Sequence, residues 1–201
     1  MLIGSRRAGL ALVLGTAVTL AACKKGDEYA ATDTGVKDTG MAMAADTAAP
    51  PPTALTDANI VYILDNANML DSAAGAVAAT KGTSADVRDF GKRMMRDHHT
   101  LRQQGQDLAK KLGVTPEAPP NDDSQAQLDN TMKTLNGAAK GKDFDKAYID
   151  NEVVYHMSVL QTATSAMAAA QNAELKNLIQ KAAPAIQAHL DMAQGIQKKM
   201  Q

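Results

Sequence analysis

From Leu55 onward, apolar residues recur at alternating steps of three and four, the spacing of an amphipathic helix with one buried face. Breaks in this pattern predict four long helices and a short one. The long helices are predicted to begin at caps provided by Thr56 or Asp57, Thr83 or Ser84, Asp143, and Asn172, and to end near Thr80, Leu112, Gln171 and Met200. The short helix is predicted for residues 124–139, and Pro184 should interrupt and kink the last long helix.

The connections between these helices predict their packing. The first and second long helices are joined by a few residues, as are the third and fourth, so each pair should form an antiparallel hairpin. A crossover of roughly 30 residues, which contains the short helix, separates the two hairpins. Two hairpins and one long crossover form the ferritin-like arrangement. We therefore predict an all-α fold for residues 55–201, a ferritin-like four-helix bundle, and the 3% aromatic content and lack of Trp agree with it.

The first 22 residues have the pattern of an export signal. Arg6 and Arg7 precede an uncharged apolar run over residues 10–22, which is too short to span a bilayer but suits a signal peptide. The run ends in Leu20-Ala21-Ala22-Cys23, which resembles the lipobox of bacterial lipoproteins. We therefore predict a lipoprotein signal peptide over residues 1–22 and lipidation of Cys23. The paired arginines also partly match a twin-arginine signal, so the export route stays open.

Residues 23–54 are predicted to be a disordered tether between the lipid and the bundle. They are rich in Ala, Thr, Asp and Gly, carry no periodic apolar face, and close with three successive prolines. Lys24 and Lys25 follow the cysteine where an aspartate would act as an inner-membrane retention signal. The sequence thus predicts a cell-envelope protein held by lipid, with the outer membrane facing the periplasm as its place.

Three of the four histidines fall on the inward rows of the predicted helices. The row of the second helix reads Val87, Gly91, Met94, His98, Leu101, Gly105, Leu108 and Leu112. His156 and His189 occupy equivalent rows of the third and fourth helices, each near the middle of its helix. Since antiparallel helices of similar length align their midpoints, the three imidazoles should lie close together, with Glu152 one turn from His156 and Asp71 added by the first helix.

This cluster has two interpretations. The first is a metal site, because imidazoles and carboxylates that project inward from facing helices are common ligands in bundles. A single ion of zinc, iron or copper would suit it, and Met94 and Met192 leave copper in consideration. The second is a hydrogen-bonded polar layer without metal. The Glu-x-x-His pairs of diiron proteins are absent, and the sequence alone indicates no definite cofactor.

Net charge, cysteine content and the lack of several catalytic motifs reduce the number of possible function classes. Cleavage of the predicted signal peptide would remove Arg6 and Arg7 and leave 19 basic and 22 acidic residues, a net charge of −3. This charge disfavours nucleic acid as a partner. The single cysteine excludes an internal disulfide, and no nucleophile elbow or phosphate loop occurs. Next to His98, we expect His99 to face solvent and Asp97 to solvate it.

Three motifs carry a resemblance to a known family. They are Met94-Met95-Arg96-Asp97-His98, then Phe144-Asp145-Lys146-Ala147-Tyr148 with His156, and Ala183-Pro184 with His189-Leu190. In this order and spacing they resemble the bacterial ferritin-like family known as domain of unknown function 4142, over residues 55–200. The resemblance implies a ferritin-like bundle, an exported location and no established activity. It also implies Glu at the position of Asp71 and Gln at that of Glu152, where this chain differs.

Two function classes follow from the sequence. The first is a non-catalytic envelope lipoprotein whose helical surface serves an interaction or a stress-related role. The second is a metal-binding or redox protein that uses the midplane histidines. The sequence favours the first class because the diiron ligand pattern is missing, and it names neither a protein partner nor a substrate. The membrane, through lipid on Cys23, is the one partner that it predicts.

Overall fold

The computed structural model describes residues 55–201. The signal peptide predicted for residues 1–22, the lipidated Cys23 and the tether predicted for residues 23–54 lie outside the described residues. Within residues 55–201 the structure contains helices and no strand. None of these helices is apolar over a length that could cross a membrane.

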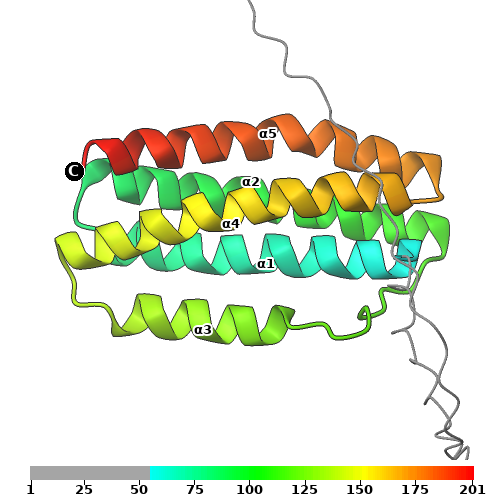
Figure 1. Ribbon diagram of the computed structural model, residues 1–201, viewed down its shortest axis with the longest axis horizontal. Helices are drawn as coiled ribbons and strands as arrows, with labels where there is room; N and C mark the ends of the chain where they lie inside the picture. Colours follow the sequence, from blue (N-terminus) through cyan, green and yellow to red (C-terminus); the bar gives the residue numbers. More distant parts are fainter. Residues whose placement is uncertain (1–54) are drawn as a thin grey trace, which may run out of the picture. The chain divides into compact units, whose positions relative to one another are not determined.

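The bundle consists of four long helices and a shorter one (Figure 1). The long helices are α1 (Asp57–Lys81), α2 (Ala85–Leu112), α4 (Lys142–Ala169) and α5 (Ala173–Lys198), and the shorter one is α3 (Ser124–Gly137). Helix α1 packs mainly on α2 and α4 mainly on α5, while α2 also contacts α5 and α1 contacts α4. Helix α3, within the crossover, lies along the outside of α1. This arrangement confirms the predicted all-α bundle with one long crossover.

The helix ends agree with the sequence at most positions. Thr56 and Asn59 form a capping box, Ser84 accepts a hydrogen bond from the backbone N–H of Val87, and Asn172 caps α5. The expected cap at Asp143 is wrong. Helix α4 begins at Lys142, after Gly141 with its φ of 140°, so Asp143 already lies inside the first turn and interacts favourably with the helix dipole.

The predicted interruption of the last helix at Pro184 is wrong. Helix α5 runs from Ala173 to Lys198 with Pro184 inside it. Proline removes one N–H from the helical ladder and crowds the preceding turn. In a helix packed against both α4 and α2, tertiary contacts outweigh that local cost.

Two aspartates tie the hairpins together at opposite ends of the bundle. Asp145, in the first turn of α4, accepts hydrogen bonds from the backbone N–H groups of Thr83 and Ser84, both at 2.8 Å, and from the Thr83 hydroxyl at 2.7 Å. Asp57, in the first turn of α1, accepts from the backbone N–H groups of Gln171 and Asn172 at 2.8 and 3.0 Å. Each hairpin thus binds the turn of the other, which fixes their relative height.

The apolar core is divided into two clusters by a buried polar layer. One cluster contains Ala74, Ala78, Val87, Phe90, Met94, Leu135, Phe144, Tyr148, Ile149 and Ala193. The other contains Ile60, Val61, Ala109, Ala163, Ala166, Ala170, Leu175 and Ile179. Between them along the helices lie Asp71, His98, Glu152, His156 and His189, all at most 2% exposed.

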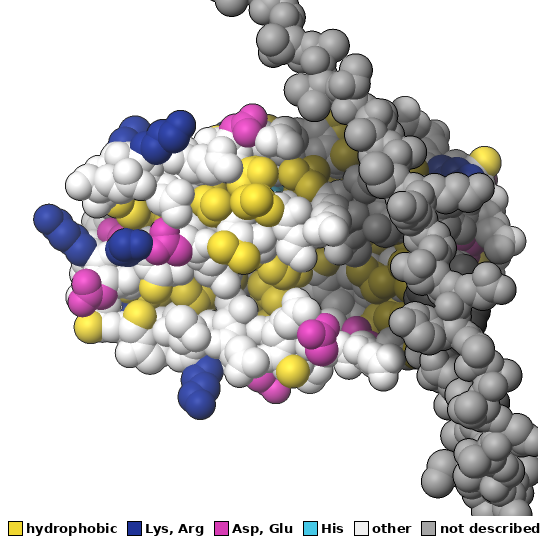
Figure 2. Space-filling view, in the orientation of Figure 1, with side chains coloured by type: hydrophobic (Ala, Val, Ile, Leu, Met, Phe, Trp, Pro, Cys, Tyr) yellow, Lys and Arg dark blue, Asp and Glu magenta, His cyan; other side chains and the backbone are white. Residues whose placement is uncertain are grey.

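Beside this layer α1 and α2 come into very close contact. A Cβ atom added to Gly75 would lie 2.6 Å from the carbonyl oxygen of Gly91, so glycine is required there. On the face shown in Figure 2, apolar side chains are exposed along the middle and histidine is almost entirely hidden. Val154 and Met157, on α4, are the most exposed large apolar side chains of the described residues, at 69% and 56%.

Candidate metal centre

Three helices contribute one histidine each to the centre of the bundle. His98 comes from α2, His156 from α4 and His189 from α5. The ring centroids of His98 and His189 are 5.2 Å apart, those of His156 and His189 5.5 Å, and those of His98 and His156 5.6 Å. The structure thus brings together the three histidines that the helical rows place at the midplane.

Each ring has one nitrogen occupied by a hydrogen-bond acceptor. His98 Nδ1 donates to Asn68 Oδ1 at 2.9 Å, and His156 Nδ1 donates to the carbonyl oxygen of Glu152 at 3.0 Å. His189 Nε2 donates to Asp97 Oδ2 at 3.1 Å. Because these partners accept, the ring nitrogen that faces each of them carries the proton.

The second nitrogen of each ring therefore carries a lone pair. His98 Nε2, His156 Nε2 and His189 Nδ1 are buried and have no hydrogen-bond partner. One ring nitrogen from each of the three residues lies within 4.8 Å of those of the other two. Buried nitrogen atoms are rarely left without a partner, so these three imidazoles form a candidate ligand site.

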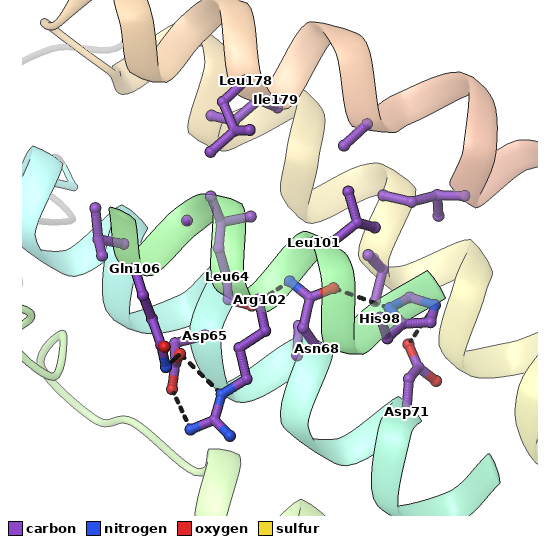
Figure 3. A pocket seen from close by; sticks show the side chains of 16 residues that line it. Leu64, Asp65, Asn68, Asp71, His98, Leu101, Arg102, Gln106, Leu178 and Ile179 are labelled. Carbon is purple, nitrogen blue, oxygen red and sulfur yellow. Dashed lines mark hydrogen bonds and ion pairs between the residues drawn. The ribbon is translucent and has the colours of Figure 1, made fainter. Parts of the chain in front are cut away.

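Two buried carboxyl groups adjoin the imidazoles. Asp71 Oδ2 lies 3.4 Å from His98 Nε2, and Glu152 Oε2 lies 3.4 Å from His156 Nδ1 (Figure 3 shows the first pair). None of the four carboxyl oxygens has a hydrogen-bond partner. Asp71, Glu152 and His156 form a second group whose candidate ligand atoms lie within 4.8 Å of one another.

Burial sets the protonation of this centre. It raises the pKa of Asp71 and of Glu152 well above their usual values, and the charge of Asp71 raises that of Glu152 further. Burial and the neighbouring histidines lower the pKa of His98 to about 3. Burial lowers the pKa of His156 to about 4 and also lowers that of His189, where Asp97 opposes it. All three imidazoles are neutral at pH 7, the form that binds metal ions.

The donor set fits a transition-metal ion. Zinc lies about 2.0–2.1 Å from histidine nitrogen and carboxylate oxygen, so two ligand atoms of a tetrahedral site are about 3.4 Å apart. Asp71 Oδ2 and His98 Nε2 already have this separation. The histidine nitrogens, at up to 4.8 Å, would approach one another by at most about 1.4 Å. The three histidines form one candidate ligand group, and Asp71 and Glu152 form a second one with His156, so this layer could hold an ion.

The structure identifies two residues that sequence reasoning missed or misplaced. Asn68 orients His98, and its own amide is fixed because Nδ2 donates to the Leu64 carbonyl at 2.6 Å. Asn68 follows Leu64 by four residues and precedes Asp71 by three, so helical spacing could have found it. Hydrogen bonds of this kind set the tautomer and orientation of metal-binding histidines.

The expectation that Asp97 solvates His99 is wrong. His99 is exposed, whereas Asp97 reaches from α2 to His189 on α5. That contact depends on which helices are neighbours, which the local sequence does not specify. Met94 is buried in one apolar cluster and Met192 packs against it, so both belong to the core and give copper no support.

The fold and the site define an all-α, ferritin-like bundle with a buried histidine and carboxylate layer. A family model described as Domain of unknown function (DUF4142) matches residues 42–196, which is most of the chain. The chain belongs to this family, as the three motifs predicted. Comparisons with curated proteins and with solved structures gave no match.

Replacement of Glu152 by Met should stabilise the metal-free, full-length chain by about 1–3 kcal/mol at pH 7, because it removes a buried carboxyl group without partners. Glu152 has a raised pKa when folded, so the wild type loses stability as pH rises above the unfolded pKa of about 4.3. The advantage of Glu152→Met should therefore be larger at pH 7 than at pH 4, measured by urea unfolding.

The matched control is Glu117→Met, in an exposed loop position, which should change the free energy of unfolding by less than about 0.5 kcal/mol. If Glu152→Met instead lost about 1–3 kcal/mol of stability, or if its gain became smaller as the pH rose, Glu152 would support the fold as an ionised group.

Proposed function

We propose that this chain is a lipid-anchored cell-envelope protein whose helical bundle binds one divalent transition-metal ion. His98, His156 and His189 supply three neutral nitrogen ligands, and Asp71 supplies a carboxylate. Imidazole with carboxylate suits zinc and iron(II), and no thiolate lies among the described residues. The single observation that carries the proposal is the convergence of three buried imidazoles, each with one ring nitrogen that has no hydrogen-bond partner.

The hydrogen bonds outside the ligand set favour metal over a structural layer. A layer that served only the fold would gain most if its groups bonded to one another. Here Asn68, Asp97 and the Glu152 carbonyl bond only the outward nitrogens and leave the inward ones free. This is the arrangement by which proteins orient and polarise metal-binding imidazoles.

The alternative is a bundle without metal whose surface binds another protein. The exposed Val154 and Met157 of α4 support it, because large apolar side chains in water often mark contact surfaces. It leaves the inward-facing nitrogens and the four unpaired carboxyl oxygens without a role. We therefore place metal binding first.

The full-length chain, purified without a histidine tag, should bind about one equivalent of Zn²⁺ or Co²⁺, measured by elemental analysis and by the visible absorption of Co²⁺. His98→Ala should weaken binding by at least about 100-fold, because it removes a ligand from the centre. His99→Ala is the matched control. The His99 side chain is next to His98 in the sequence but is exposed, so its removal should leave binding unchanged.

Absence of stoichiometric metal in the wild type after reconstitution would contradict the proposal. Equal binding by His98→Ala and His99→Ala would also contradict it. Circular dichroism of both variants checks that the helices are retained, so that a lost site is not confused with a lost fold.

The anchoring part of the proposal depends on residues outside the described bundle. Leu20-Ala21-Ala22-Cys23 supplies the acylated cysteine, and several acyl chains at about 0.8 kcal/mol per buried methylene hold a protein on a membrane without a spanning helix. Lys24 and Lys25 provide no retention signal for the inner membrane. The metal-binding bundle would then face the periplasm at the outer membrane.

Cys23→Ser should abolish incorporation of labelled palmitate, because the thiol that accepts the lipid is lost. Lys24→Asp should keep the label but move the protein from the outer to the inner membrane fraction in a Gram-negative host. Unchanged labelling in Cys23→Ser would exclude lipidation at this residue. Unchanged fractionation of Lys24→Asp would refute the sorting interpretation while leaving the anchor intact.

A further inference from the structure

A cavity of about 40 Å³ adjoins the histidine cluster on the side of α1 and α2. Asn68, Asp71 and His98 line its inner end, and Asp65, Arg102 and Gln106 line the other end (Figure 3). Its walls between them are aliphatic and come from α1, α2, α4 and α5: Val61, Leu64, Ala67, Leu101, Val159, Leu178, Ile179, Ala182 and Ile186. A cavity of this size holds about three water-sized groups.

The polar groups at the outer end are already paired. Arg102 Nε and Nη2 donate to the two carboxyl oxygens of Asp65 at 2.9 and 3.0 Å, and Gln106 Nε2 donates to Asp65 Oδ1 at 2.7 Å. The Asp65 carboxylate raises the pKa of Arg102, so the pair stays ionic and mutually neutralised. This end offers no unpaired charge to an ionic ligand.

The inner end of the cavity also offers few free polar groups to a ligand. Both polar groups of the Asn68 side chain are engaged, by His98 and by the carbonyl oxygen of Leu64. The groups left without partners there are His98 Nε2 and the Asp71 oxygens, which belong to the metal centre. A molecule in the cavity would therefore contact aliphatic walls and the metal centre, with no further donor or acceptor to bind it.

Gly105 keeps the cavity open. It lies toward the C-terminal end of α2 and lines the cavity wall, and a Cβ atom built on it would have no heavy atom within 4 Å. Glycine inside a helix costs about 1 kcal/mol relative to alanine. At this position the space that it leaves belongs to the cavity rather than to a close contact between helices.

We infer that this cavity binds a small uncharged molecule of two or three heavy atoms, of the dioxygen or nitric oxide kind, beside His98. Its volume suits a ligand of this size, and its aliphatic walls and paired charges disfavour ions. The approach of this molecule to the ion rests on the proposed metal binding. Iron(II) accepts more than four ligands and so can keep a position for it beside the histidines and Asp71.

The test uses Gly105→Leu, whose Cβ would meet no heavy atom within 4 Å and whose larger side chain should occupy the cavity. Leucine also favours a helix more than glycine does. Gly195→Leu is the matched control, because Gly195 lies in α5, away from this cavity, and also has no heavy atom within 4 Å of its added Cβ. The first readout is ¹²⁹Xe NMR on the metal-free, full-length chain. The second is nitric oxide binding to the iron(II)-loaded chain, followed by electron paramagnetic resonance.

Xenon should bind the wild type and Gly195→Leu, and binding to Gly105→Leu should be weaker by about tenfold or more. The iron–nitric oxide signal should likewise be reduced in Gly105→Leu alone. Equal xenon binding in all three proteins, or none in the wild type, would overturn the inference. A chain that binds xenon as expected but takes up no iron would refute the proposed function while the cavity stands as a ligand site.

Discussion

The register between the two helical hairpins determines which side chains lie next to one another inside the bundle. Asp145 binds the α1–α2 turn and Asp57 binds the α4–α5 turn, so each hairpin is held at one end by a carboxylate from the other. A shift of one hairpin against the other by one helical turn, about 5.4 Å, would separate His98 from His156 and His189 by more than a metal ion can bridge. The two aspartates therefore position the midplane, although both lie at the bundle ends.

The polar layer at that midplane is costly to the fold. Five ionisable side chains are buried between two apolar clusters, and seven of their nitrogen and oxygen atoms have no hydrogen-bond partner. Burial holds the imidazoles neutral and opposes ionisation of the carboxyl groups, so the metal-free layer gains little from its own electrostatics. A divalent cation would supply the missing partner for the nitrogens and favour ionised Asp71. The cavity beside His98, with its aliphatic walls, would then give that ion a largely apolar surrounding on one side.

Helical periodicity and cap residues were enough to predict the fold, including the crossover helix and the antiparallel hairpins. The midplane histidines, Asp71 and Glu152 were also predictable, because each lies on an inward row of its helix. The Asp97–His189 contact was not, since it joins neighbouring helices across 92 positions of the sequence. The cap at Asp143 was wrong because the backbone geometry of Gly141 sets the start of α4. Ring orientation, which decides whether a histidine can bind metal, depends on packing that no local pattern contains.

X-ray absorption spectroscopy of the zinc-loaded, full-length chain tests the central claim most directly. The account predicts three imidazole nitrogens and a carboxylate oxygen at about 2.0–2.1 Å, with the outer-shell scattering of intact imidazole rings. A shell of oxygen atoms with one imidazole or none, or sulfur at about 2.3 Å, would contradict it. Either result would mean that the ion binds elsewhere on the chain and that the buried histidines are not its ligands.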